Sequence, residues 1–450
     1  MVVIAAARRS PEPAPAGLPS AWGVRNAHDP TVVRDTDGTW YMFSTDAAAG
    51  AADVATGVQV RHSVDLVNWT WLGTALDGVP RPAFEWTGAA GLWAPEVVRW
   101  PSADGDRWHM YYSASTFGST TSVIGLAVAS ALSGPWYDRG IVVATREGET
   151  TQNAIDAAVT RDRHGVPWLT YGSFFSGIYA LPLDPHTGFA RMAGDLGIRI
   201  ARRAASVEGA IEGAFVLYRR EEDHFVLFAS YDSLFGSYHV RVAVAAEISG
   251  PYHDYLGHSM TNVDAEPSSV GTKVLGSYSF DADTAWLAPG HNSILVEASS
   301  GMSPGDEYFM VHHVRFAADP AQHIAHLRRT FFTGGGWPVV SPQPFAGRDS
   351  ETIEPPQALE GPWRAVRHEP ASTEPVAASK VTVAEVADDG DGVSLPREFD
   401  GRAQSVRLVV AGTEIDAVVF GSWDWARGAA ALSFSGISDD GIAWFGTKGA

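Results

Sequence analysis

The sequence lacks cysteine altogether: none of its 450 residues is a Cys. This excludes disulfides, thiolate metal sites and a cysteine nucleophile. Basic residues are also scarce, because 32 Lys and Arg stand against 52 Asp and Glu, for a formal net charge of −20. Nucleic acids and anionic membrane surfaces are recognised through basic patches, so neither is expected as a partner. A neutral substrate is compatible with this charge.

Long apolar stretches are missing as well. No segment approaches the roughly 18 apolar residues of a membrane-spanning helix. The first residues, MVVIAAARRSPEPAPAG, place a short apolar run before two arginines and a proline-rich stretch. That is the wrong order and length for a secretory signal. We therefore expect a cytoplasmic protein; the alternative is a secreted protein whose signal is absent from this sequence.

A hairpin pattern recurs five times along the chain. Each copy has a short apolar or β-branched run, a turn rich in Asp, Gly or charge, and an aromatic-rich apolar run. The first copy reads DPTVVRDTDGTWYMFST. The copies open at Asp29, Glu96, Asp156, Glu212 and His291, at intervals of 67, 60, 56 and 79 residues. Antiparallel units repeated at such a period predict an all-β fold, a five-bladed β-propeller. A β-sandwich is the alternative, but it gives no reason for the repeats.

The polar residues that open the five copies are expected to converge. In a propeller the first strand of each blade lines the central channel, so a residue at its start points toward the common axis. Glycoside hydrolysis needs one carboxyl group that donates a proton and a second, ionised one that activates water or attacks the sugar. A third carboxylate can raise the pKa of the acid by repulsion. Asp29, Asp156 and Glu212 suit these roles, and the pattern alone does not assign them.

Several motifs then resemble glycoside hydrolase family 43, in the arabinanase branch that acts on α-1,5-linked arabinan. They run in the family's order over roughly residues 25 to 345. The matching stretches are HDP at His28, WAPE at Trp93, NAID at Asn153, YGSFFSGI at Tyr171, IEGAFVLYR at Ile211, APGHNSIL at Ala288 and GGWPVVSP at Gly335. The tail SWDWARGAAALSFSGISDDGIAWFG, from Ser422, resembles the end of the C-terminal domain of two-domain arabinanases.

The resemblance implies an inverting glycosidase that cleaves α-1,5-L-arabinofuranosidic bonds of arabinan or arabino-oligosaccharides. It assigns the base to Asp29, the acid to Glu212 and the pKa-modulating role to Asp156. Glu208 is a rival for the acid, but Glu212 directly precedes the apolar run AFVLY. An exo-acting α-L-arabinofuranosidase or β-xylosidase of the same family is the alternative activity. A sugar-binding propeller without catalysis would be expected to lack one of the three carboxylates.

Further positions carry weaker predictions. The resemblance places calcium beside His291, which could equally be a packed core histidine. Trp93 is expected to stack on a sugar or to pack between blades, and Asn153 to bind substrate. Ser173 is expected to be a hydroxyl contact or a turn residue. Glu96 stands where relatives carry aspartate, so the resemblance gives it no clear role.

The chain is expected to divide into a propeller catalytic domain at 20–345, a linker at 346–358 and a C-terminal domain at 359–450. Short alternating runs such as SVRLVVAG predict a small β-barrel or sandwich for the last of these. That domain either supports the propeller or binds polysaccharide. The expected partner is a neutral polysaccharide or oligosaccharide, arabinan, and the protein is expected to be a monomer.

Overall fold

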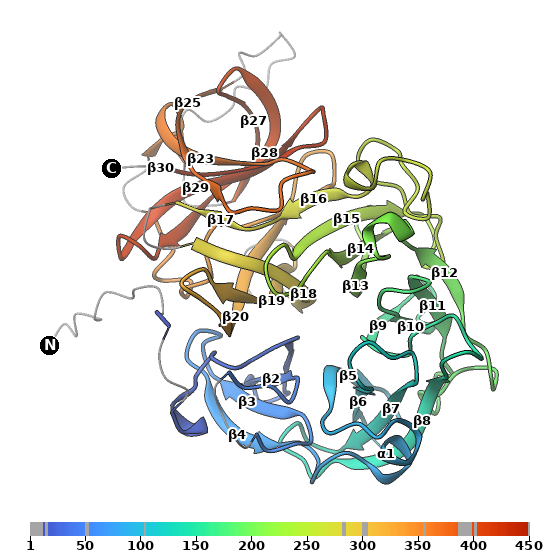
Figure 1. Ribbon diagram of the computed structural model, residues 1–450. Coiled ribbons are helices and arrows are strands. Elements are labelled where there is room, and N and C mark those ends of the chain that lie inside the picture. The colour runs from blue at the N-terminus through green and yellow to red at the C-terminus, as the bar shows by residue number, and fades with distance from the viewer. Residues whose placement is uncertain are drawn as a thin grey trace, which may run out of the picture.

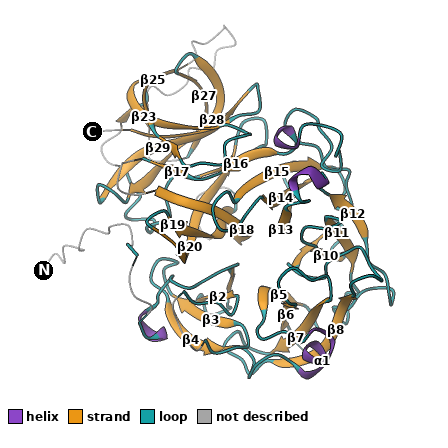
Figure 2. Ribbon diagram, viewed as in Figure 1, coloured by secondary structure: helices purple, strands orange, loops and turns teal. Residues whose placement is uncertain are grey.

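The computed structural model of the chain describes residues 12–13, 17–49, 54–102, 105–280, 285–298, 305–353, 357–385, 398–399 and 403–448. The first eleven residues, on which the absence of a secretory signal was argued, lie outside these ranges. Within them, β-strands make up nearly all regular structure, with one α-helix, α1 (Arg81–Thr87), and three short 3₁₀ turns (Figure 2). The all-β prediction is confirmed. No described helix has the length and apolarity to cross a membrane.

Five sheets, antiparallel except for one strand pair of the fifth, contain the described strands between residues 31 and 340. Four of them consist of four strands that pair in chain order. These are β1 (Thr31–Arg34), β2 (Trp40–Ser44), β3 (Gln59–Ser63) and β4 (Thr70–Thr74); β5 (Trp93–Trp100), β6 (Arg107–Ala114), β7 (Ser122–Ala129) and β8 (Tyr137–Thr145); β9 (Ala158–Arg161), β10 (Pro167–Tyr171), β11 (Ile178–Pro182) and β12 (Ile198–Ala201); and β13 (Ile211–Arg219), β14 (His224–Tyr231), β15 (His239–Ala245) and β16 (Thr272–Leu275).

The fifth sheet has six strands in the order β21-β20-β19-β18-β17-β24. Its strands are β17 (Tyr278–Ser279), β18 (Ala285–Glu297), β19 (Glu307–Phe316), β20 (Asp319–Phe332), β21 (Pro338–Val340) and β24 (Val376–Ala377). The last strand comes from the C-terminal part of the chain and pairs parallel to β17. The predicted C-terminal domain therefore contributes main chain to a sheet of the preceding domain.

The five sheets follow one another around a ring (Figure 1). Their innermost strands are β1, β5, β9, β13 and β18, and each contacts the next, with β18 returning to β1. The ring is closed by packing between the first and fifth sheets, where Met42, Phe309, Val311 and Leu327 are buried in one cluster. Removing such apolar surface from water contributes ~25 cal/mol per Å², so this contact fixes the two ends of the ring against each other.

The hairpins of the repeat form as their sequences predict. In the first, Gly38 has φ +94° and follows Asp37, whose Oδ1 accepts the N–H of Thr39 at 2.8 Å. In the third, Gly165 has φ +80° at the turn between β9 and β10. Glycine adopts these positive φ values without the steric cost that a Cβ brings. Each turn therefore sets the register that places the start of the inner strand at the centre of the ring.

A closed six-stranded barrel follows the ring, in the order β23-β25-β27-β28-β29-β30. Its strands are β23 (Gly361–His368), β25 (Ser379–Glu385), β27 (Gln404–Val410), β28 (Thr413–Asp424), β29 (Ala429–Ser438) and β30 (Ala443–Lys448), and a short pair, β22 (Gln357–Ala358) and β26 (Glu398–Phe399), stands beside it. The Phe331 and Phe420 rings stack at 4.2 Å between β20 and the barrel. Asp416 of the barrel accepts the backbone N–H groups of Gly334 and Gly335 at 3.1 and 2.8 Å.

The predicted linker at 346–358 lies partly outside the described residues, at 354–356. Of its described part, Ala346 and Ile353 are buried, and Ile353 packs in the core of the barrel. The Glu351 carboxylate accepts the N–H of Ala346 at 3.1 Å. These residues are therefore held against the neighbouring structure.

Candidate active site

Three residues that open repeats share an unusual backbone conformation. Asp29, Asp156 and His291 have φ values of +49°, +62° and +50°. Such left-handed conformations cost most L-residues about 1–2 kcal/mol and persist where the surrounding structure holds them, often at functional sites. Each backbone N–H is held by a side chain of the adjacent sheet, as His291 N–H is by Ser230 Oγ at 2.8 Å.

The other two openings do not occupy this position, although the repeat placed all five in register. In β5, β13 and β18 the pairing is interrupted by a register shift. The residue at positive φ is His291 in β18, but it is Ala94 (+41°) in β5 and Gly213 (+54°) in β13. Glu212 therefore lies one residue before the expected position and Glu96 two residues after it. A bulge adds a residue to one strand of a pair, and the repeat pattern does not reveal where.

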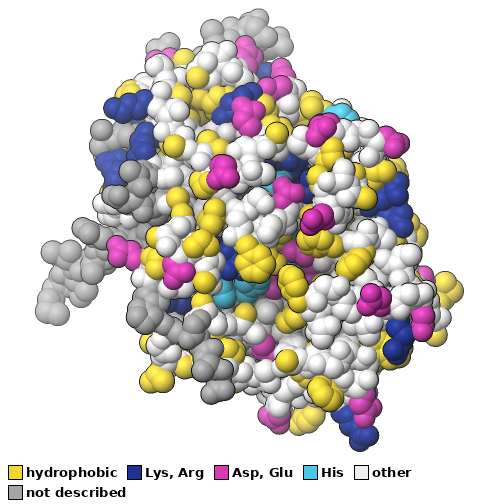
Figure 3. Space-filling model, in the orientation of Figure 1, with side chains coloured by type: hydrophobic (Ala, Val, Ile, Leu, Met, Phe, Trp, Pro, Cys, Tyr) yellow, Lys and Arg dark blue, Asp and Glu magenta, His cyan; other side chains and the backbone are white. Residues whose placement is uncertain are grey.

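A cavity of about 720 Å³ opens at the centre of the ring. Figure 3 shows histidine and acidic side chains gathered in the middle of this face. The cavity is lined by all seven residues proposed for the site: Asp29, Trp93, Asn153, Asp156, Ser173, Glu212 and His291. The convergence expected from the repeat is therefore observed, with Glu96 outside the lining. Glu96 is buried and accepts a hydrogen bond from Thr31 Oγ1 at 2.8 Å.

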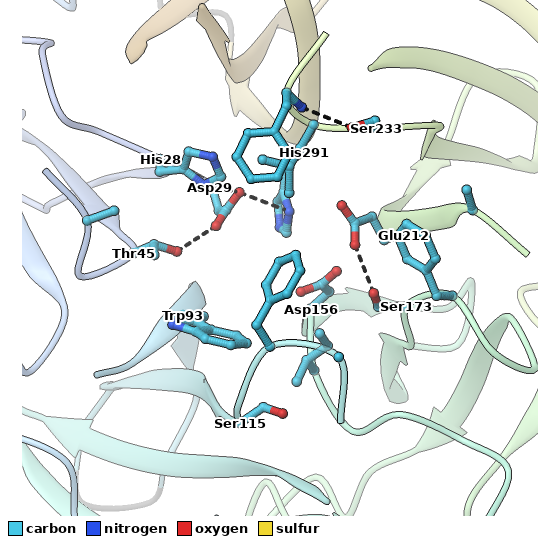
Figure 4. Close-up of a pocket in the computed structure, with 18 of the residues that line it drawn as sticks. His28, Asp29, Thr45, Trp93, Ser115, Asp156, Ser173, Glu212, Ser233 and His291 are labelled. Carbon is cyan, nitrogen blue, oxygen red and sulfur yellow. Dashed lines mark hydrogen bonds and ion pairs between the residues drawn. The ribbon is translucent and has the colours of Figure 1, made fainter. Parts of the chain in front are cut away.

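Asp29 is surrounded by imidazole groups. Its Oδ1 lies 2.8 Å from His28 Nδ1, 3.1 Å from His291 Nδ1 and 3.5 Å from His313 Nδ1, and its Oδ2 accepts Thr45 Oγ1–H at 2.6 Å (Figure 4). Burial alone would raise the pKa of Asp29. Positive charge on His28 and His291, with the His28 hydrogen bond, outweighs burial and holds that pKa well below its ordinary value. Asp29 is therefore the ionised member of the site.

The His28 ring is oriented by Arg315. Arg315 Nη2 lies 3.2 Å from His28 Nε2, and a guanidinium can only donate. When the His28 ring is neutral, its Nε2 accepts this hydrogen bond and its proton lies on Nδ1, directed at Asp29. Arg315 is itself fixed by the carbonyls of Leu234 and Pro320, at 2.6 and 2.8 Å.

Glu212 lies across the cavity from Asp29, with His291 between them (Figure 4). Its Oε2 accepts Ser173 Oγ–H at 2.8 Å and its Oε1 accepts Tyr238 O–H at 2.9 Å. Burial raises the pKa of Glu212 and repulsion from Asp29 adds to this. His291 and the two hydrogen bonds lower the pKa, but the net direction is upward. Glu212 is therefore a carboxyl group that retains its proton at pH values where an ordinary glutamate has lost it.

Asp156 and His291 complete the charged set. Burial, with repulsion from Glu212 and Asp29, raises the pKa of Asp156 to about 7 despite the opposing effect of His291. Burial lowers the pKa of His291, but attraction to Asp29, Asp156 and Glu212 outweighs it and raises the pKa overall. The site thus holds one carboxylate with a low pKa, two carboxyl groups with raised values and a cationic imidazole.

Tyr238, which was not predicted as a site residue, holds the carboxyl group of Glu212, and two glycines make room for the side chains of the site. Tyr238 is buried against Gly290, where a Cβ would approach the Tyr238 ring to 2.2 Å. Gly213 leaves room for His291 in the same way, since a Cβ there would come within 3.0 Å of that residue. No pattern marks Tyr238 as a partner of Glu212, because the two strands meet only in the tertiary structure.

The remaining predicted residues differ in what they contact. Asn153 is buried, with Oδ1 accepting Ser122 Oγ–H at 2.7 Å and Nδ2 donating to the Ser173 carbonyl at 3.4 Å. Asn153 thus supports the Ser173 segment. Trp93 is partly exposed at the cavity wall, and Glu208 is exposed at its edge. Glu208 therefore lacks the burial that raises the pKa of Glu212.

The residues present do not fit a calcium site built mainly from protein ligands. Calcium takes six to eight oxygen ligands. Five of the six carboxylate oxygens of Asp29, Asp156 and Glu212 already contact protein donors. His28, Asp29 and His313 lie close enough together to hold a metal ion. Hydrogen bonding explains this proximity without a metal, since Asp29 N–H donates to His313 Nδ1 at 3.3 Å.

The raised pKa of Asp156 gives a prediction about stability. A carboxyl group whose folded-state pKa exceeds its ordinary 3.8 contributes stability at low pH, and that contribution is lost as pH rises through about 7. Asp156→Asn should therefore raise the melting temperature above wild type by roughly 2–5 °C at pH 8.5. At pH 4 the difference should nearly vanish. Thermal unfolding at both pH values measures this, with exposed Asp264→Asn as the control; a destabilised Asp156→Asn at pH 8.5 would contradict it.

The chain is similar in sequence to known proteins over most of its length. The chain is 27% identical to "Extracellular endo-alpha-(1->5)-L-arabinanase 2" of Bacillus subtilis (strain 168), over 94% of this chain and 93% of that protein. It is 29% identical to "Extracellular exo-alpha-(1->5)-L-arabinofuranosidase ArbA" of Cellvibrio japonicus (strain Ueda107), over 70% of this chain and 86% of the relative.

The comparison corrects the predicted compartment. Relatives from Bacillus subtilis, Thermotoga petrophila and Cellvibrio japonicus are all named extracellular. The prediction of a cytoplasmic protein is therefore wrong. It rested on the first residues of this sequence, whose composition is a poor guide to the compartment in which the folded protein works.

The fold and the family agree. The crystal structure of endo-1,5-alpha-L-arabinanase from Thermotoga petrophila RKU-1 matches with a TM-score of 0.77 at 25% identity, over 95% of this chain and 99% of that one. The model of glycosyl hydrolases family 43 matches residues 24–338, which contain all the residues of the cavity described above. The chain belongs to glycosyl hydrolases family 43.

Proposed function

We propose that the protein cleaves α-1,5-L-arabinofuranosidic bonds of arabinan or arabino-oligosaccharides by a single displacement that inverts the anomeric centre. One observation carries the proposal: three carboxyl groups around one cavity have pKa values displaced in different directions. Glycosidases need one carboxyl group that is protonated and another that is ionised at the same pH. A purely sugar-binding site has no use for that difference.

In this mechanism Asp29 is the general base. Its low pKa keeps it ionised, and its imidazole neighbours fix the orientation of its oxygens. A water beside Asp29 would attack the anomeric carbon as the base takes its proton. Glu212, on the other side of the cavity, would give its proton to the leaving oxygen. Ser173 and Tyr238 hold the Glu212 carboxyl group in position throughout.

Asp156 is proposed to modulate the acid. When ionised, it repels charge on Glu212, because the repulsion between the two is mutual. That repulsion helps Glu212 to keep its proton until the leaving group takes it. The cationic imidazole of His291 offsets part of the negative charge of the three carboxyl groups.

We infer that the ring of five sheets is a five-bladed β-propeller and that the barrel is a C-terminal domain. The closed circle of contacts between innermost strands supports the first inference. The contacts through Phe331, Phe420 and Asp416 favour a supporting role for the barrel over an independent binding role. The boundaries at 345 and 359 and the monomeric state stay predictions, as does calcium, which no step above uses.

Endo action outside the cell is proposed over exo action. Two relatives that match this chain over both of its parts, at 94% and 95% of its length, are named extracellular endo-arabinanases. The relative named as an exo enzyme matches 70%. The substrate is then a neutral polysaccharide, which agrees with the acidic composition of the chain.

The test is the size of the products released from linear α-1,5-arabinan, followed by chromatography, with the anomeric form read by NMR in the first minutes. We expect a ladder of oligomers at early times, each with a new β-configured reducing end. Arabinose alone from the start would replace endo with exo action. Retention of the α configuration would overturn the inverting mechanism, and binding without any release would favour a sugar-binding propeller.

A further inference from the structure

A second hollow, of about 590 Å³, adjoins the catalytic cavity. The two share Phe175 and Glu208 in their linings. The hollow lies between the segment after β10, the end of β12 with the segment that follows it, and the loop that contains Val263. Its size is within the range of small-ligand sites, about 300–1,000 Å³. A chain leaving the catalytic cavity past Phe175 would enter this hollow.

The hollow is lined by three arginines, Arg199, Arg202 and Arg203. Arg203 is neutralised by Asp232, with which it forms an ion pair, and it also donates to the Ala210 carbonyl. Among the described residues, no acidic side chain forms an ion pair with Arg199 or Arg202. Three arginines and one carboxylate, Glu208, line the hollow, so it carries positive charge in a chain whose net charge is −20.

The guanidinium groups of Arg199 and Arg202 are held in a way that leaves their terminal nitrogens available. Arg199 Nε donates to Tyr179 Oη at 3.0 Å, and its guanidinium lies 5.5 Å from the centre of the Tyr179 ring. Arg202 Nε donates to the Thr261 carbonyl at 3.1 Å. In the described structure, neither residue uses a terminal nitrogen in a hydrogen bond. A planar guanidinium group that is fixed through Nε and has both Nη atoms free to donate can form two hydrogen bonds to the two oxygens of a carboxylate.

We propose that this hollow is a binding site for a carboxylate-bearing sugar, a uronic acid residue linked to the chain that occupies the catalytic cavity. Arg199 and Arg202 bind the carboxylate, and Phe175, a residue that is 52% exposed at the junction, stacks against the sugar ring. The inference rests on the proposed function, because a sugar polymer in the cavity is what would carry the acidic residue into the hollow. The enzyme would then favour polysaccharide regions where neutral and acidic sugars meet.

The test measures binding of trigalacturonic acid by calorimetry at low ionic strength, with its fully methyl-esterified form as the matched neutral ligand. We expect the wild-type protein to bind the acid and not the ester, and to lose binding in ~1 M NaCl, where the Debye length is about 3 Å. The double variant Arg199→Gln/Arg202→Gln should weaken binding at least ten-fold. The control Arg191→Gln/Arg220→Gln, which changes two exposed arginines outside both hollows, should bind as wild type does.

A second variant excludes misfolding as the cause of a loss. Glu208→Gln removes the negative charge at the junction and should strengthen binding of the acid, a gain that a damaged fold cannot produce. Equal binding of acid and ester by the wild-type protein, or unchanged binding by the Arg199→Gln/Arg202→Gln variant, would overturn the inference. Arabinan hydrolysis is measured separately. Hydrolysis without trigalacturonate binding removes only the site proposed in the hollow, and binding without hydrolysis removes only the proposed function.

Discussion

Glu212→Gln should lower kcat on linear arabinan by about 10³–10⁴-fold, the upper part of the range for loss of a general acid. Glutamine keeps the size of the side chain; its carbonyl oxygen can accept the hydrogen bond of one hydroxyl, Ser173 or Tyr238, and its NH2 group can donate to the other. It has no proton to give to the leaving oxygen. We therefore expect KM and the melting temperature to change little while kcat collapses.

An activated substrate separates loss of the acid from loss of the site. A 4-nitrophenyl arabinofuranoside has a leaving group that departs without protonation, so Glu212→Gln should retain far more activity on it than on arabinan. Glu208→Gln tests the rival assignment in the same assay. If Glu208 were the acid, Glu208→Gln and not Glu212→Gln would show the selective loss on arabinan, and the roles proposed here would be exchanged.

Replacement of Asp29 should be as severe, with a different signature. Asp29→Asn removes the base that takes the proton from water, and we expect kcat to fall about 10³–10⁴-fold on arabinan and on the activated substrate alike. Asparagine is the replacement of choice because Asp29 has φ +49°, and Asn tolerates this region better than Ala does. The exposed Asp37→Asn, in the turn of the same hairpin, is the matched control.

A small anion should restore activity when the base is absent. Asp29→Gly suits the left-handed backbone and opens space beside the anomeric carbon. Azide needs no base to become a nucleophile, so added azide should increase turnover of this variant and give a β-arabinofuranosyl azide. An α-azide would indicate attack on a covalent intermediate and therefore a retaining mechanism. Failure of both Asp29 variants to lose activity would place the base elsewhere in the cavity.

The residues that could be found from sequence were those whose position follows from the hairpin repeat. Asp29, Asp156 and His291 open copies of a repeat that the alternation of apolar and turn residues marks clearly, and they meet at the centre of the ring, although His291 lies inside β18 and not at its start. The repeat also placed Glu96 at the centre of the ring, and this prediction was wrong because a bulge in β5 puts Ala94 at that position. A bulge depends on how two strands pair, so the sequence of one strand does not reveal it.

Partners that lie far apart in the sequence were beyond prediction for the same reason. Tyr238 meets Glu212 across 26 positions, and Arg315 meets His28 across 287. The pKa of each carboxyl group depends on these contacts and on burial, neither of which has a local signature. The hollow formed by Arg199 and Arg202 likewise requires the segments after β10 and β12 and the loop with Val263 to come together.

The sequence by itself determined the all-β class, the five repeats, the acidic composition and the three carboxylates that could do glycosidase chemistry, because these follow from composition, alternation and local turns. Only the tertiary structure decided which carboxyl group is ionised. Asp29 has its low pKa because its neighbour His28 and two histidines distant in the sequence, His291 and His313, surround it. Glu212 has its raised pKa because the closed ring buries it near Asp29. Long-range electrostatics and desolvation exist only once the ring is closed.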